Sequence, residues 1–108
     1  MDETWALTKM TRVEVVVGGE EIPVLTELLS EVGAIGFTVV SNVSGLGHSG
    51  YHQGRLLFND RNALSLITVV LPADRAGALL DGLRSLLAHR SGVLLVSDTW
   101  VSRPEYFQ

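Results

Sequence analysis

Apolar residues in this 108-residue chain recur with period two in some segments and with period 3.6 in others, and the order of these segments limits the possible folds. Residues 12–17, which read RVEVVV, alternate as a half-buried strand does. Leucines spaced by three and four residues later form two helical stripes. We expect a strand over residues 12–17, then a helix that begins at Glu20 and is capped by Gly33, and a second strand over 36–44. A loop over 45–60 follows and leads to a third strand over 62–71. The second helix begins at Asp74 and is terminated by Ser91 and Gly92, and the last strand covers 93–101.

The alternation also predicts which side chains face the core. Members of the two helical stripes are Leu25, Leu28, Leu29 and Val32, then Leu79, Leu80, Leu83, Leu86 and Leu87. In the first strand, Val13, Val15 and Val17 share one face. In the second strand, one face carries Phe37, Val39, Ser41 and Val43. The strand over 62–71 is apolar on both faces, which predicts a central position in the sheet. Residues 1–11 lack a period and are predicted to form a leader that Trp5 anchors by packing.

The order strand, helix, strand, strand, helix, strand is that of the ferredoxin-like sandwich. We therefore expect a single α+β domain over residues 1–108, with a βαββαβ antiparallel sheet and two helices on one face. This fold carries many functions and decides none of them.

Composition narrows the class of protein. Hydrophobic residues make up 46% of the chain and charged residues only 19%, which suggests surface that is buried against other subunits. The net charge of -4 disfavours nucleic acid as a partner, because phosphate binding needs clustered Lys and Arg. The lack of cysteine excludes disulfides and thiolate chemistry. No secretory signal or membrane-length apolar run is recognised, so a cytoplasmic protein is expected.

The glycine-rich segment from residue 45 is the first candidate site, since four glycines lie within residues 45–54. Glycines let successive backbone N–H groups approach a phosphate, but a hairpin is the simpler reading of the spacing alone. The segment joins two strands, so it is not a dinucleotide fingerprint, and no Lys follows the glycines as in a P-loop. Because His48 and His52 have no third potential ligand nearby in the sequence, zinc binding is not favoured and no metal site is expected.

Two further candidates lie late in the chain. Arg90, with Ser91 and Gly92, follows the second helix and could either cap it or hold a phosphate. Arg103 follows the last strand and could be solvated or bind an anion. No catalytic arrangement of side chains can be placed, so no catalytic residue is assigned.

Residues 36–50, which read GFTVVSNVSGLGHSG, resemble the PII signalling-protein pattern G-[MF]-T-V-x-x-V-x-G-F-G-x-x-x-G with one extra residue before the glycines. The segments on either side also resemble the family. Residues 28–33 resemble the end of its first helix, and residues 66–74 resemble its third strand and the V-V-P-D corner that follows. In that family the segment at 45–60 is the T-loop and the segment at 89–93 the B-loop. The loop is short, the basic residues after the glycines are replaced by His48 and Ser49, and the B-loop lysine is absent. The chain therefore resembles the divergent short-T-loop branch, the carboxysome-associated PII type.

The resemblance implies a homotrimeric, non-enzymatic regulator that binds adenine nucleotides (ADP, AMP or ATP) in clefts between subunits and needs no catalytic cofactor. Its site residues by this resemblance are Gly36, Phe37, Thr38, Gly45, Leu46, Gly47, His48, Ser49, Thr68, Val70, Arg90, Ser91, Gly92 and Arg103. Bicarbonate is an implied second ligand, with Arg55 and Arg61 as candidates to bind it. The implied partner is a transporter or carboxysome-related protein of inorganic carbon uptake or fixation.

The implied mechanism is a switch in which the T-loop is poorly ordered without ligand and ordered with it. A rival from another class is a small enzyme of the same fold, of the isomerase type, that uses His48 or His52 as its base. An RNA-binding module is disfavoured, because the strands lack the RNP1 signature and the charge is negative.

Overall fold

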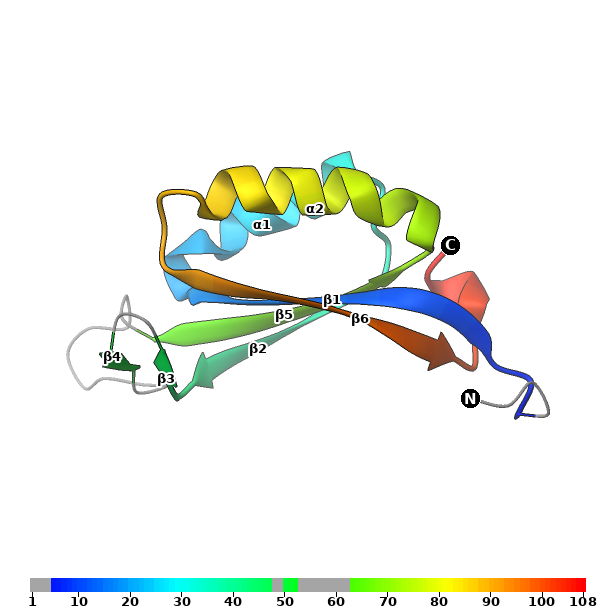
Figure 1. The fold of residues 1–108 in the computed structure, drawn as a ribbon, viewed down its shortest axis with the longest axis horizontal. Helices are drawn as coiled ribbons and strands as arrows, with labels where there is room; N and C mark the ends of the chain where they lie inside the picture. Colours follow the sequence, from blue (N-terminus) through cyan, green and yellow to red (C-terminus); the bar gives the residue numbers. More distant parts are fainter. Residues whose placement is uncertain (1–4, 48–49, 53–62) are drawn as a thin grey trace.

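The computed structural model describes residues 5–47, 50–52 and 63–108 as a sheet with two helices on one face (Figure 1). The elements are β1 (Thr8–Gly18), η2 (Gly19–Glu21), α1 (Ile22–Glu31), β2 (Phe37–Val43), β3 (Gly45–Gly47), β4 (Gly50–His52), β5 (Leu64–Leu71), α2 (Ala73–Leu87), β6 (Gly92–Val101) and η4 (Pro104–Tyr106). The main sheet has the order β2-β5-β1-β6, and all its pairs are antiparallel. The expected ferredoxin-like α+β fold is therefore confirmed, with β5 and β1 in the centre.

The core lies between the helices and the face of the sheet that they cover. Val13, Val15 and Val17 are each at most 1% exposed, as their alternation predicted. The stripe residues of the helices meet them, and the core cluster comprises Val13, Val15, Val17, Leu25, Leu29, Ala34, Ile67, Val69, Leu71, Ala76, Leu79 and Leu83. Burial of these apolar groups holds the helix layer on the sheet.

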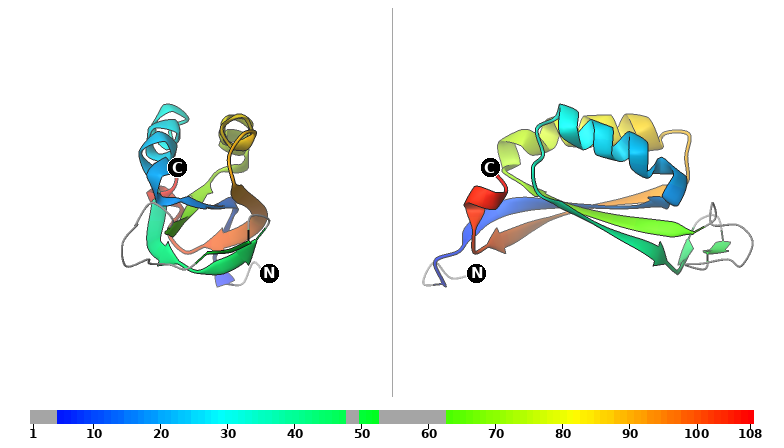
Figure 2. Two further views of the ribbon diagram at one scale, coloured as in Figure 1. Left: turned by 90° about the vertical axis from the view of Figure 1, so that its left-hand side faces the viewer. Right: turned by 180° about the vertical axis from the view of Figure 1, so that it is seen from behind.

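No helix of the described residues covers the opposite face of the sheet, which we call the open face (Figure 2). Side chains directly opposite one another in adjacent strands point to the same face. Val40 pairs with Leu66, Leu66 with Val16, and Val16 with Val93, so an apolar row crosses all four strands of the open face. Val40 and Val93 are each 48% exposed and Leu95, in the next row, is 54% exposed.

Three expectations about the N-terminal residues and the loop over 45–60 were wrong. The leader does not extend to residue 11, because β1 begins at Thr8, where it pairs with Val101 of β6. Trp5 does not anchor by packing, since it is 67% exposed. The predicted loop over 45–60 contains β3 and β4, which pair as a separate two-stranded sheet.

The face assigned to Val43 was also wrong, because β2 contains a bulge. The register of β2 on β5 shifts between Ser41 and Val43, and Asn42 lies in the left-handed region at φ 61°. Ser41 pairs with Ser65, whose side chain is buried on the helix side, whereas Val43 pairs with Leu64. A bulge inserts one unpaired residue, so the side chain that follows it points to the other face.

Candidate functional site

The first group of candidate residues meets on the neighbouring strands β2 and β5. Thr38 pairs with Thr68, and the carbonyl of Gly36 accepts a hydrogen bond from the Val70 N–H at 3.4 Å. Thr38, Thr68 and Val70 belong to the open face. Phe37 pairs with the buried Val69 and therefore points to the helix side, although it remains 42% exposed. Within this group, Phe37 alone does not share a face with the other side chains.

Thr68 has polar neighbours that the sequence analysis did not single out. Its hydroxyl donates to Glu14 Oε2 at 3.4 Å, and Arg12 Nε lies 3.6 Å from Glu14 Oε1 and donates to Ser97 Oγ at 3.2 Å. Arg12 and Glu14 alternate with the core valines of β1, which was a signal for a polar pair on the open face. The result is a polar patch across β5, β1 and β6 within an otherwise largely apolar surface.

The second group lies at the other end of the sheet. Arg90, Ser91 and Gly92 join α2 to β6, and Gly92 pairs with Val17 at the same end of the sheet as the junction of β2 and β3, although on the opposite edge. Arg90 Nε lies 2.9 Å from Glu21 Oε2, and its Nη1 donates to the Leu86 carbonyl at 2.7 Å. The bond to Leu86 caps the end of α2, as the capping interpretation predicted. The ion pair with Glu21 also ties that end to the turn before α1, which the sequence did not indicate.

The glycines of the T-loop segment are described only in part. Gly45, Leu46 and Gly47 form β3, which directly follows the bulged strand β2. His48, Ser49, Arg55 and Arg61 lie outside the described residues, so their predicted roles stay predictions.

The strand order keeps the two groups apart in one copy of the chain. Gly36, Phe37 and Thr38 belong to the β2 edge of the sheet, whereas Arg90, Ser91 and Gly92 join the β6 edge. Three strand spacings separate these edges, which is roughly 14 Å. A single small ligand therefore cannot contact both groups in one protomer without crossing the open face.

Arg103 follows β6 and interacts with the C-terminal tail. Its Nη1 donates to the Tyr106 hydroxyl at 2.9 Å, and its guanidinium carbon lies 5.6 Å from the centroid of that ring. The tail in turn reaches the β2 edge, where Phe107 lies against Gly36. Arg103 was a candidate from its position after the last strand, but nothing local in the sequence indicated either aromatic contact.

The family-model description "nitrogen regulatory protein P-II" matches residues 10–106 of the chain. The chain belongs to the PII family. The resemblance seen in residues 36–50 is thereby confirmed. No protein of curated function matches the sequence.

Solved PII-like structures share the fold over most of the chain. CPII from Thiomonas intermedia K12, a nitrogen regulatory PII-like protein bound to ADP, AMP and bicarbonate, is 36% identical, with 94% of this chain and 95% of CPII covered and a TM-score of 0.86. The apo form of CPII is 32% identical, with 88% of this chain and 94% of that chain covered and a TM-score of 0.70. A PII-like signaling protein from Thermus thermophilus, 19% identical with 94% and 98% covered and a TM-score of 0.79, supports the fold alone.

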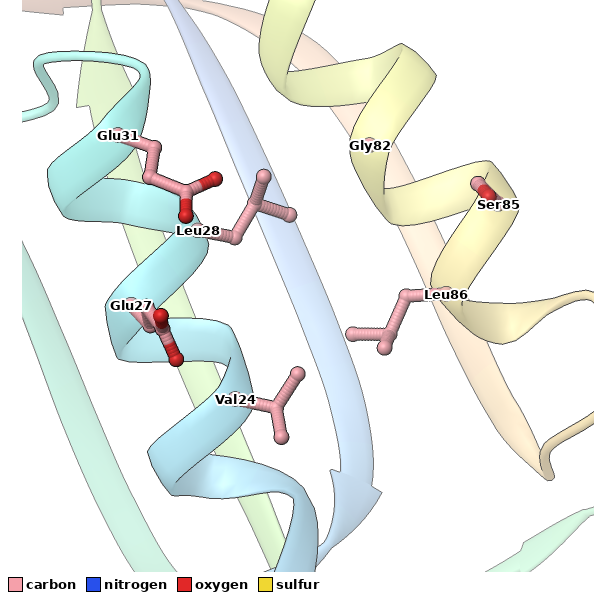
Figure 3. A pocket seen from close by; sticks show the side chains of 7 residues that line it. All are labelled: Val24, Glu27, Leu28, Glu31, Gly82, Ser85 and Leu86. Carbon is pink, nitrogen blue, oxygen red and sulfur yellow. The ribbon is translucent and has the colours of Figure 1, made fainter.

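A groove on the helix layer of this PII protein lies apart from both groups (Figure 3). It has a volume of about 350 Å³ and is lined by Val24, Glu27, Leu28, Glu31, Gly82, Ser85 and Leu86. Leu28 fills the space beside Gly82, where a Cβ would lie 2.7 Å from Leu28 Cδ1. These lining residues belong to α1 and α2 and include none of the candidate nucleotide residues.

Over the described part of the chain, His, Asp and Glu side chains do not gather in a group that could hold a metal ion. Among the residues that the structure describes, no helix has the length and hydropathy needed to cross a bilayer. Asp98, an acid within β6, is exposed and lies 3.5 Å from Lys9 Nζ.

Proposed function

We propose that this PII protein is a non-enzymatic regulator that binds adenine nucleotides in clefts between the subunits of a homotrimer, with bicarbonate as a second ligand. The observation that carries the proposal is the similarity over 94% of the chain to CPII, which was solved bound to ADP, AMP and bicarbonate. The proposed nucleotide ligands are ADP, AMP and ATP.

The separation of the two candidate groups supports a site between subunits. In one copy, the groups lie at opposite edges and toward opposite ends of the sheet, so a nucleotide could contact both only by lying diagonally across the open face. A neighbouring copy that presents its β6 edge to the β2 edge of the first would bring them together. The base and ribose would then meet Gly36, Phe37, Thr38, Thr68 and Val70, while the phosphates would meet the B-loop.

The apolar open face supports assembly into a trimer. Exposed apolar patches that extend over several strands are rarely left in water by soluble monomers. The row of Val40, Leu66, Val16 and Val93 gives each copy such a patch. Closed symmetric assembly would cover it in every copy.

The phosphate contacts in this proposal come from few cations. Arg90, with Ser91 and Gly92, would hold phosphate from the B-loop, and Arg103 would lie nearby. The amides of Gly45, Leu46 and Gly47, with His48 and Ser49, would contribute from the T-loop base. Arg55 or Arg61 would bind bicarbonate as a bidentate pair.

The regulatory output in this proposal is T-loop switching. Ligand would order the T-loop, which would then engage or release a transporter or carboxysome-related protein of inorganic carbon uptake or fixation. The cytoplasmic location, the partner and the link to carbon rest on the family resemblance.

Calorimetry with ATP, ADP, AMP, cyclic AMP and bicarbonate tests the ligand class. We expect ADP and AMP to bind at least as well as ATP, because each missing charge-assisted hydrogen bond costs about 1.5–3 kcal/mol and few cations are present for a γ-phosphate. If ATP with Mg²⁺ bound a hundredfold more tightly than both ADP and AMP, this expectation would be wrong. Nucleotides recovered unchanged after prolonged incubation with the protein would agree with a non-enzymatic role.

Hydrogen exchange tests the switch. Amide exchange across residues 45–60 should slow when ADP is added and slow further with bicarbonate, because bound anions would pin the glycine-rich backbone. Unchanged protection at saturating ADP would remove the switch. Slowing by ADP with no effect of bicarbonate would keep the switch and discard bicarbonate as a ligand.

A further inference from the structure

The C-terminal tail folds back from the β6 edge toward the start of β2 (Figures 1 and 2). It forms the short helix η4, in which the Tyr106 N–H donates to the Arg103 carbonyl at 3.1 Å and the Phe107 N–H to the Pro104 carbonyl at 2.9 Å. These hydrogen bonds give the tail a defined course beyond the last strand.

Phe107 anchors the tail on the β2 edge. A Cβ built on Gly36 would lie 2.7 Å from Phe107 Cε1 and 3.1 Å from the Tyr106 carbonyl oxygen. Heavy atoms do not approach a real Cβ so closely, so the tail packs on Gly36 only because that residue has no side chain. Phe107 is partly buried there, although it lies one residue from the end of the described chain.

Tyr106 holds the arginine that begins the same tail. Its hydroxyl accepts a hydrogen bond from Arg103 Nη1 at 2.9 Å, and its ring lies under the guanidinium at 5.6 Å. A guanidinium has five N–H donors, so this bond leaves four donors for an anion. A long side chain that is already held loses less conformational freedom when it binds a phosphate.

We propose that residues 104–107 are a positioning element of the nucleotide site, in which Phe107 anchors the tail on Gly36 and the Tyr106 hydroxyl holds Arg103 for a nucleotide phosphate. This inference rests on the proposed function, because the phosphate contact belongs to Arg103. Tyr106 and Phe107 act through Arg103 and Gly36 and need not touch the ligand.

Tyr106→Phe is the sharpest test, because it keeps the ring under the guanidinium and removes only the hydroxyl. We expect the Kd of the full-length protein for ADP to rise about three- to tenfold, the range expected when one long side chain must be immobilised on binding. The Kd for adenosine, which has no phosphate, should not change. In an Arg103→Gln background, the same substitution should have no further effect.

Phe107→Ala provides a second variant. Loosening the anchor should weaken ADP binding in the same direction; because Phe107 packs on Gly36 beside the proposed base site, the adenosine comparison is made with Tyr106→Phe only. Ile35→Ala is the matched control, because Ile35 adjoins Gly36 in the chain, is 58% exposed and has no part in the proposed element. Circular dichroism and thermal unfolding confirm that each variant is folded.

Several results would overturn the inference. Unchanged or tighter ADP binding by Tyr106→Phe would do so, and tighter binding would indicate that the tail obstructs the site. An equal loss for ADP and adenosine would indicate a merely structural role. If the unaltered protein does not bind ADP, the proposed function fails and the role of the tail at a nucleotide site fails with it. Whether the Tyr106 hydroxyl holds Arg103 is decided separately by ¹⁵N relaxation of the Arg103 Nε–H in the ligand-free protein: greater motion in Tyr106→Phe would support this hold, and equal motion would refute it.

Discussion

Asn42 lies at the bulge in β2, where the sequence has one residue more than the PII pattern. The PII pattern has one residue fewer before its glycines, and the bulge lies within the same part of β2. Without a bulge, an added residue would reverse the face of every side chain after it. The bulge absorbs the addition, and β2 can accept it because it is an edge strand with a single neighbour in the sheet.

We expect Asn42→Val to lower the free energy of unfolding by about 1–2 kcal/mol, because Asn42 has φ 61° and a β-branched residue is strained there. Asn42→Gly should be nearly neutral, since glycine adopts this conformation without strain but is more flexible when unfolded. Urea denaturation of both variants measures the difference. Equal stabilities would show that the bulge relaxes in the Asn42→Val variant.

At the scale of elements, the strands and helices were predictable wherever their own periodicity encoded them. The valines of β1 and the leucines of α1 and α2 mark buried faces by spacing alone. Residues 8–11 were missed because only pairing with distant strands makes them part of β1: all four pair with β6, and Thr11 also pairs with β5. The contact of Phe107 with Gly36 was missed for the same reason, since nothing local in either segment indicates the other.

The candidate site was predictable to a smaller extent. The PII resemblance pointed to residues on β2, β5 and the end of α2, but the sequence did not reveal the engagement of Arg90 by Glu21 or of Arg103 by Tyr106. Side-chain partners of this kind depend on the geometry of helix ends and turns. A pattern of residue types does not contain that geometry.

The two glycines of α2 provide a matched pair for a helix-stability prediction. A Cβ at Gly77 would meet nothing within 4 Å, so Gly77→Ala should raise the free energy of unfolding by about 0.5–1 kcal/mol. Gly82→Ala should gain less, because its Cβ would lie 2.7 Å from Leu28 Cδ1 and that side chain would have to move. Thermal unfolding of the two variants checks the order, and a larger gain at Gly82 would contradict it.

At the scale of the whole molecule, the open face is expected to decide the oligomeric state. Leu95 is 54% exposed and lies opposite Glu14, so Leu95→Lys can pair with that carboxylate in an isolated copy. Burying the added ammonium in a subunit interface is costly, so the proposed trimer should dissociate. Light scattering at micromolar concentrations measures the mass.

Val24→Lys is the control for this substitution. Val24 is 43% exposed on the helix layer, away from the open face, so the variant should have the same mass in solution as the unaltered protein, that of the proposed trimer. A trimer that persists in the Leu95→Lys variant would place the subunit contact elsewhere.

The position of β2 and β6 at opposite edges has a consequence for how the protein behaves on dilution. If a nucleotide is held only where two copies meet, free subunits bind it poorly and the ligand favours association by mass action. Apparent affinity would then fall as the protein is diluted below the concentration at which its subunits dissociate, and nucleotide would protect the assembly from heat. A cell that makes little of this chain would have fewer sites than its subunit count implies, so the amount of protein would itself set the threshold of the response.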